Sequence, residues 1–134
     1  MQLCPHLTFD GQCKAAFLAY QGIMGGEVAT MLTYGESALA SQVDVQWHDR
    51  IVHATLVAGA IELTGVDMLP PNYVRPRGFF VTLTFDVLDK AEAVFKALSE
   101  QGEVHMPFGE TFWSPGFGVV TDRFGTPWEI NTAS

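Results

Sequence analysis

The sequence is poor in basic residues and in cysteine. Seven Lys and Arg side chains stand against 15 acidic ones, which gives a formal net charge of −8 over 134 residues. Such a charge repels phosphate backbones and anionic membrane surfaces, so we expect no nucleic-acid partner and no membrane partner. The two cysteines, Cys4 and Cys13, are too few for a disulfide framework.

Long apolar runs and a secretory signal are also missing. The most apolar stretch, residues 51–66, is interrupted by His53 and Glu62, and no basic segment leads into an apolar run with a cleavage site. These absences predict a cytoplasmic protein. The 48% of hydrophobic residues can build the core of a single domain spanning residues 1–134, and the ten Phe and three Trp suggest a buried homodimer interface.

The chain contains an internal repeat. Residues 7–10, 14–15 and 26–28 recur identically 76 positions later, which makes nine identities in the 22 positions from Leu7 to Val28. Ordinary residue frequencies would give roughly one or two. The sequence therefore consists of two copies of one unit.

Each copy has the pattern of a βαβββ unit. A short strand and an Asp turn precede a helical stripe, which in the second copy is Ala91, Val94, Phe95 and Leu98, with Asp89 and Glu92 as a capping box. Three segments with strand character follow each helix: residues 27–33, 51–57 and 60–64, then residues 103–108, 116–121 and 128–132. The expected fold class is α+β, with module 1 over residues 1–67 and module 2 over residues 79–134.

Two segments fall outside the repeat. Residues 68–78 contain Pro70, Pro71 and Pro76 and are expected to be the linker. The insertion of residues 34–50 is either a mobile flap over a site or a plain surface loop.

Alternation along the strands predicts which side chains face a ligand. Residues two apart share a face, so Leu3, Pro5, Leu7 and Phe9 should pack under the first helix, and Phe79, Val81, Leu83 and Phe85 under the second. In the last strands, Ile61, Leu63, Trp128 and Ile130 should be buried. The opposite faces carry Cys, His, Thr, Phe and Asn with only two acids, which suits a concave, partly dry binding surface better than a solvated one.

Glu62 and Glu129 occupy corresponding places in the last strands of the two copies. A pseudo-twofold axis would bring them to a shared site, with His6 on the same inferred face. Two carboxylates and a histidine can hold a divalent metal or share acid and base work. The alternative is that both glutamates are solvated acids at the mouth of a wide groove, and that His6 is a hydrogen-bonded wall residue.

The pattern resembles the vicinal oxygen chelate superfamily, which includes glyoxalase I, bleomycin-resistance proteins and extradiol dioxygenases, and within it the PhnB-like branch. The motifs that carry the resemblance span nearly the whole chain: Phe9 to Cys13 with Ala16 and Tyr20, Gly25 to Glu27, Met31 with Tyr34 to Ser37, His53 with Ala54, Glu110 to Trp113, and Asp122 to Trp128. The resemblance implies a curved, mostly antiparallel sheet of two tandem βαβββ modules around a cavity, and paired modules in a homodimer.

The resemblance also implies positions for metal ligands. Members that are enzymes take one ligand from the first strand and one from the last strand of each module, and these places fall at Cys4, Glu62, Phe80 and Glu129. The glutamates match the pattern, and His6 lies one step along from Cys4. Phe80 cannot bind a metal, and Cys4 stands where the family usually has a histidine.

Further candidates for ligand contact are aromatic and polar. Trp47 and Trp113 lie in or beside loops where a ligand could stack on them, and Phe80, Thr82, Asn131 and His53 are expected to line the pocket. These aromatic side chains could equally fill a dimer interface, and His53 could merely bond to the backbone. Cys13, near a helix start, could be a nucleophile with a lowered pKa.

Two functions of different classes follow. The first is a metal-dependent lyase, isomerase or dioxygenase that acts on a vicinal-oxygen substrate with one divalent ion of Zn, Ni, Mn or Fe, held by Glu62, Glu129, His6 and Cys4, with the two glutamates catalytic. The second is a metal-free protein that sequesters a small molecule without catalysis. A small-molecule ligand is expected in both cases.

Overall fold

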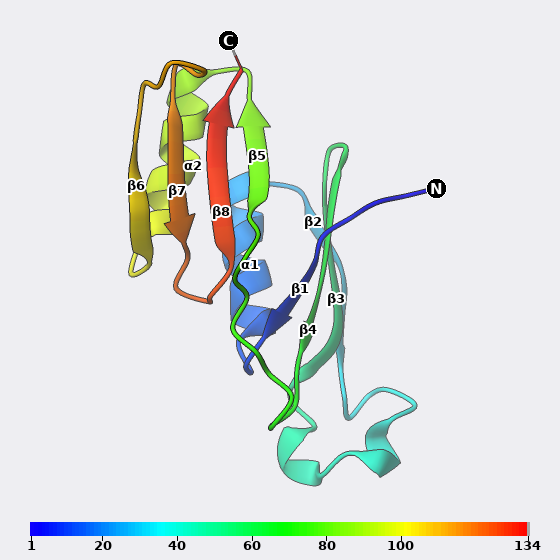
Figure 1. Cartoon of the computed structure of the whole chain (residues 1–134). Helices are drawn as coiled ribbons and strands as arrows, with labels where there is room; N and C mark the ends of the chain where they lie inside the picture. Colours follow the sequence, from blue (N-terminus) through cyan, green and yellow to red (C-terminus); the bar gives the residue numbers. More distant parts are fainter. Residues whose placement is uncertain (134) are drawn as a thin grey trace. The chain divides into compact units, whose positions relative to one another are not determined.

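The computed structural model describes residues 1–133, which form two compact units divided between Arg75 and Pro76. Unit 1 contains β1 (His6–Phe9), α1 (Cys13–Met24), β2 (Glu27–Thr33), β3 (Ile51–Ala58) and β4 (Ile61–Asp67). Unit 2 contains β5 (Val81–Phe85), α2 (Leu88–Ser99), β6 (Glu103–Gly109), β7 (Phe117–Thr121) and β8 (Pro127–Thr132). Both units are βαβββ, so the repeat found in the sequence and the α+β fold class are confirmed (Figure 1).

The sheets of the two units have the same topology. The strand order is β1-β4-β3-β2 in unit 1 and β5-β8-β7-β6 in unit 2. The first strand of each unit runs parallel to the last strand, and the other pairs are antiparallel. Each last strand therefore lies between the first strand and the third, in an inner position of its sheet.

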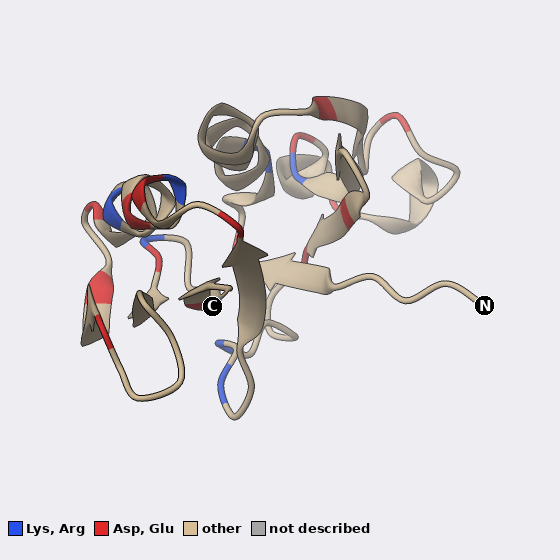
Figure 2. Ribbon diagram, turned by 90° about the horizontal axis from the view of Figure 1, so that it is seen from above, with Lys and Arg blue, Asp and Glu red and all other residues tan. Residues whose placement is uncertain are grey.

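The helix of each unit packs on one face of its own sheet. In unit 1 the ring of Phe17 lies 6.1 Å from that of Phe9, edge to face, and both side chains are fully buried. In unit 2 the predicted stripe of Ala91, Val94, Phe95 and Leu98 is buried, as are Trp128 and Ile130 of β8. Figure 2 shows residues of both charge signs on α2. These charged residues are exposed, whereas the stripe is buried.

The first strands are shorter than the alternation predicted. β1 begins at His6, where pairing with Thr64 of β4 starts, and β5 begins at Val81 opposite Trp128. Leu3 is 97% exposed and Phe79 is 51% exposed, so the prediction that they pack under the helices is wrong. These residues precede the paired part of each strand, so they do not belong to a sheet and their side chains are not directed toward the helix.

Two further expectations of local structure fail. Ile61 is 42% exposed because it is the first residue of β4, beside the Gly59 turn, although Leu63 after it is buried. The capping box is absent, since α2 begins after Val87 without a side-chain cap, and Asp89 lies within its first turn. An acid there still interacts favourably with the helix dipole.

The connecting segments contain no strand and no α-helix. Residues 68–80 contain no strand or helix, as expected of the linker. The insertion of residues 34–50 contains two 3₁₀ helices, η1 (Ala40–Gln42) and η2 (Val45–Trp47). The extent of a single domain over both modules stays a prediction.

Candidate functional site

The face of the unit 1 sheet that points away from α1 carries a row of polar side chains. The strand register places His6, Thr64, Thr55 and Thr30 next to one another across all four strands. Leu7, Leu63 and Gly65, which alternate with them, lie on the helix side, where a Cβ on Gly65 would stand 2.5 Å from the ring of Phe17. The row is therefore a property of the exposed sheet face, as the alternation predicted for His6 and Thr64.

His6 is oriented by Thr64 in this row. Its Nδ1 lies 2.7 Å from the Thr64 hydroxyl, and this hydroxyl also lies 3.3 Å from the carbonyl oxygen of Pro5. A histidine whose Nδ1 is held by a hydrogen bond has its Nε2 available for other contacts.

The other candidates of unit 1 make their own contacts. Glu62 accepts a hydrogen bond from Gln2 Nε2 at 3.0 Å, and His53 Nε2 lies 3.2 Å from the Thr55 hydroxyl. Cys4 is half-buried and lies before β1, outside the sheet. Trp47 has the guanidinium of Arg50 4.4 Å from its ring centroid, so one face of this indole is already covered.

The corresponding face of unit 2 combines an acid, an amide and aromatic rings. Glu129 pairs with Thr82 on β5 and with Val119 on β7, and its Oε1 accepts from the Thr82 hydroxyl at 3.0 Å. Asn131, two residues further along β8, lies opposite Phe117 of β7. Glu129, Thr82 and Asn131 thus lie on one face of the unit 2 sheet, and Thr82 contacts Glu129.

Asn131 is poorly satisfied. Its Nδ2 lies 3.5 Å from the Thr84 hydroxyl, at the long limit of a hydrogen bond, and its buried Oδ1 has no partner among the described residues. Buried amide oxygens are nearly always paired in folded proteins, so this one calls for an explanation.

An aromatic wall stands beside Asn131. The ring of Trp113 lies 5.2 Å from that of Phe117, with their planes at 72°, and Phe117 neighbours Asn131 across β7 and β8. Phe117 was not foreseen as a site residue, although its place two positions before Val119 on an alternating strand could have indicated it. Phe80 lies just before β5 and is 47% exposed.

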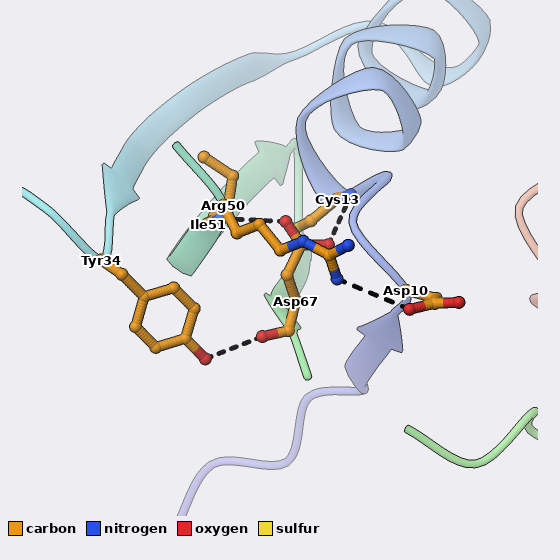
Figure 3. A network of polar contacts seen from close by, with 6 residues as sticks. All are labelled: Asp10, Cys13, Tyr34, Arg50, Ile51 and Asp67. Carbon is orange, nitrogen blue, oxygen red and sulfur yellow. Dashed lines mark hydrogen bonds and ion pairs between the residues drawn. The ribbon is translucent and has the colours of Figure 1, made fainter. Parts of the chain in front are cut away.

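Two buried carboxylates, to which no structural role was assigned from the sequence, accept hydrogen bonds from backbone N–H groups near the ends of these strands. Asp67, at the end of β4, is 1% exposed and accepts from the backbone N–H of Cys13 and of Ile51, at 3.0 and 2.8 Å. The Tyr34 hydroxyl donates to its carbonyl oxygen at 2.7 Å (Figure 3). These bonds fix the base of the insertion to α1 and β4, which disfavours a flap hinged at Tyr34.

Asp122 is the corresponding buried hydrogen-bond acceptor of unit 2. It accepts from the backbone N–H of Phe124 and of Thr126 and from the indole N–H of Trp128, at 2.9 to 3.0 Å. The turn that leads into β8 is thereby closed, and the starting point of the strand that carries Glu129 is set.

Cys13 is not the reactive thiol considered above. Its side chain is fully buried, and this burial, together with the negative charge of Asp67, raises the pKa of the thiol far above its ordinary value. The thiolate needed for nucleophilic attack is therefore scarce at neutral pH. The same two causes, burial first, raise the pKa of Tyr34.

The donors for a metal do not assemble within either unit. Among residues 1–133, no group of three or more His, Cys, Asp or Glu side chains is placed to hold an ion. Unit 2 offers Glu129 with Thr82, and Phe80 adds no donor. Because protein zinc sites use at least three protein ligands, the side chains of each unit, taken by itself, do not fit a bound metal, and we derive no step through one.

Comparison with known proteins identifies the family. The family model of the Glyoxalase/Bleomycin resistance protein/Dioxygenase superfamily matches residues 6–130. The chain belongs to this superfamily. Protein YjdN of Escherichia coli K12 is 32% identical over 139 residues, which cover 98% of this chain and 95% of that protein.

Solved structures agree with the assignment. Protein PA1353 from Pseudomonas aeruginosa is 39% identical, with a TM-score of 0.89 and coverage of 99% of this chain and 98% of that one. The PhnB protein from Bacillus cereus, at 21% identity, has a TM-score of 0.83 over 99% of this chain and 100% of its own. The resemblance to the glyoxalase-like and PhnB-like fold is thereby confirmed.

Membership makes this chain a glyoxalase-like protein, whose superfamily binds small-molecule ligands. None of the helices in the described part of the chain is long and apolar enough to cross a membrane.

Proposed function

We propose that the chain binds a small molecule on the sheet face of unit 2 that carries Glu129, Asn131 and Phe117, without a requirement for metal. The observation that carries the proposal is the buried Oδ1 of Asn131, which lacks a hydrogen-bond partner among residues 1–133. If the Asn131 amide rotates toward the open sheet face, an N–H or O–H of a ligand would pair with this oxygen and recover the free energy lost by leaving it unpaired.

The neighbours of Asn131 define what such a ligand must offer. Phe117, extended by Trp113, provides an apolar wall one strand away, at a spacing of about 4.8 Å. Glu129 provides an acceptor two residues along the same strand: its Oε1 accepts from Thr82, and its Oε2 has no hydrogen bond within residues 1–133. A ligand with a planar apolar part and one or two hydrogen-bond donors fits this set.

The binding test uses two variants and a control. Asn131→Ala and Glu129→Gln should each abolish or weaken by more than about tenfold the binding of hits from a fragment screen read by ¹H–¹⁵N NMR. Glu100→Gln, an exposed acid that follows α2, should leave binding unchanged. Hits whose affinity is the same in all three variants would contradict the proposal.

A second candidate is a metal-dependent lyase, isomerase or dioxygenase. It is favoured by His6, whose ring is oriented through the contact of Nδ1 with Thr64, and by the two family positions held by Glu62 and Glu129. Elemental analysis of tag-free protein before and after loading with zinc, nickel, manganese or iron decides between the two. Near-stoichiometric metal that is lost in Glu129→Gln would support the enzyme, and turnover dependent on Glu129 would rule out simple sequestration.

The homodimer and the cytoplasmic location stay proposals. The free edges of β2 and β6, which have one neighbour each, support a partner chain. Light scattering at micromolar concentration tests this, and a mass equal to one 14.7 kDa chain would contradict it.

A further inference from the structure

The loop between β6 and β7 displays two aromatic rings at the surface. Phe112 is 98% exposed and Trp113 is 47% exposed, and their ring centroids lie 4.7 Å apart with the planes at 82°. In Figure 1 this loop joins β6 to β7 at the end of the unit 2 sheet where β8 finishes. Neighbouring apolar rings that are exposed to water often mark a site of recognition.

Hydrogen bonds fix the backbone of this loop and so restrict the positions of the two rings. The backbone N–H of Thr111 donates to the carbonyl of Ser114 at 2.9 Å, and the N–H of Ser114 donates to the Thr111 hydroxyl at 3.1 Å. The Ser114 hydroxyl, 4% exposed as a residue, lies 2.8 Å from the carbonyl oxygen of Gly116 and 2.9 Å from that of Thr132 at the end of β8. A turn fixed at both ends loses little entropy when it binds a ligand.

Glu110 adds a negative charge to this hollow. Residues 110–115 line an open cavity of about 330 Å³. The segment from residue 101 to residue 121 contains no Lys and no Arg, and the structure gives the Glu110 carboxylate no ion pair in residues 1–133. The net charge of −8 adds a long-range attraction for cations.

We propose that residues 110–115, which we call the aromatic cup, bind a small organic cation of the alkylated ammonium class. The two rings meet edge to face at nearly a right angle, and Phe112 is almost fully exposed, so ring surface is open to a cation, which the negative face of an aromatic ring attracts. The carboxylate of Glu110 neutralises the charge, and the methyl groups of the ligand contact the rings. The aromatic cup adjoins the face of Glu129 and Asn131 and shares Trp113 with it, but its negative charge comes from Glu110 and not from Glu129.

Choline tests the proposal, with 3,3-dimethylbutan-1-ol as its neutral isostere. In ¹H–¹⁵N spectra of the full chain, choline should give saturable shifts at the indole N–H of Trp113 and at the backbone amides of the aromatic cup, with sodium chloride at equal concentration as the blank. The neutral alcohol should bind at least about fivefold more weakly, because it lacks the attraction between cation and ring.

Two variants and their matched controls locate the effect. Phe112→Leu keeps an apolar side chain but removes a ring, and should weaken choline binding by about fivefold. Glu110→Gln should weaken it roughly threefold. Phe79→Leu and Glu100→Gln, which change an exposed ring and an exposed acid outside the cup, should leave the affinity unchanged.

Three results would overturn the proposal. Equal affinity for choline and the neutral alcohol would mean that the cup is a plain apolar patch. Choline binding that is unaffected by both cup variants would place the site elsewhere. Absence of any saturable shift would mean that no such site exists. Since Phe112 and Glu110 are exposed, none of these results can be attributed to misfolding of the variants.

Discussion

The carboxylate of Asp67 accepts a hydrogen bond from the backbone N–H of Cys13 at 3.0 Å, across 54 positions of sequence. Its second oxygen accepts from the N–H of Ile51 at 2.8 Å. One buried side chain thus joins the end of β4 to the first residues of α1 and of β3. Figure 3 shows these bonds together with the nearby ion pair of Arg50 and Asp10.

Asp67→Asn should destabilise the fold. The amide can accept from only one of the two N–H groups and turns its own N–H₂ toward the other, which leaves a buried donor unpaired. We expect a loss of about 1–3 kcal/mol in the free energy of unfolding, measured by urea denaturation. Asp10→Asn is the control, since its 3.5 Å ion pair is exposed and its removal should change stability by less than about 0.5 kcal/mol. Equal effects of the two substitutions would contradict the structural role given to Asp67.

The two cysteines should differ in reactivity. Cys13 is fully buried with a raised pKa, caused mainly by burial and then by Asp67, whereas Cys4 is half-buried before β1. A thiol reagent such as DTNB at pH 8 should therefore modify one thiol of the folded protein quickly, and the second only when urea unfolds the chain. Cys4→Ser should remove the fast phase, and a fast phase that survives this substitution would mean that Cys13 is accessible.

The raised pKa of Cys13 also predicts a loss of stability at alkaline pH. Below about pH 8.5 the thiol is protonated in both the folded and the unfolded chain, so it contributes no pH dependence. Above that value the unfolded chain releases the proton while the folded chain keeps it, and the free energy of unfolding falls by up to about 1.4 kcal/mol per pH unit.

Urea denaturation between pH 7.5 and about pH 10, where tyrosine ionisation begins, tests this slope. Cys13→Ala should lower the stability at all pH values, through lost packing, but should flatten the decline that begins at pH 8.5. An unchanged slope in Cys13→Ala would mean that another group is responsible.

Local patterns determine much of this fold. The helical stripe from Ala91 to Leu98 and the strand of residues 27–33 follow directly from periodicity, and the repeat placed the remaining strands to within a few residues. The same alternation put Glu62, Glu129 and Asn131 on the sheet faces away from the helices. These features are predictable because each depends on residues near one another in sequence.

The features that sequence did not reveal depend on distant pairing. Leu3 continues the alternation of β1 without error, but no strand lies beside it, so the side chain remains in water. Asp67 looks like a polar residue at the end of a strand, and its two N–H partners are identified only by the path of the backbone. The unpaired Oδ1 of Asn131 also cannot be predicted from sequence, because it depends on the absence of a hydrogen-bond donor among the neighbouring residues in the fold.

Gly65 of β4 does not have a positive φ, so the cost of replacing this glycine should be steric alone. A Cβ at this position would lie 2.5 and 2.8 Å from two ring carbons of Phe17 and 3.3 Å from the sulfur of Cys13, both of which are fully buried. Because the packed ring cannot move away without displacing α1, Gly65→Ala should lower the free energy of unfolding by about 1–3 kcal/mol.

Gly22→Ala is the matched control, since nothing lies within 4 Å of its Cβ position and the residue is exposed on α1. That substitution should instead stabilise the protein by about 0.5–1 kcal/mol, through the higher helix propensity of alanine. Opposite shifts of the two thermal midpoints would establish that close packing of α1 on β4, and not backbone freedom, requires glycine at position 65, whereas two stabilised variants would show that Phe17 can move aside.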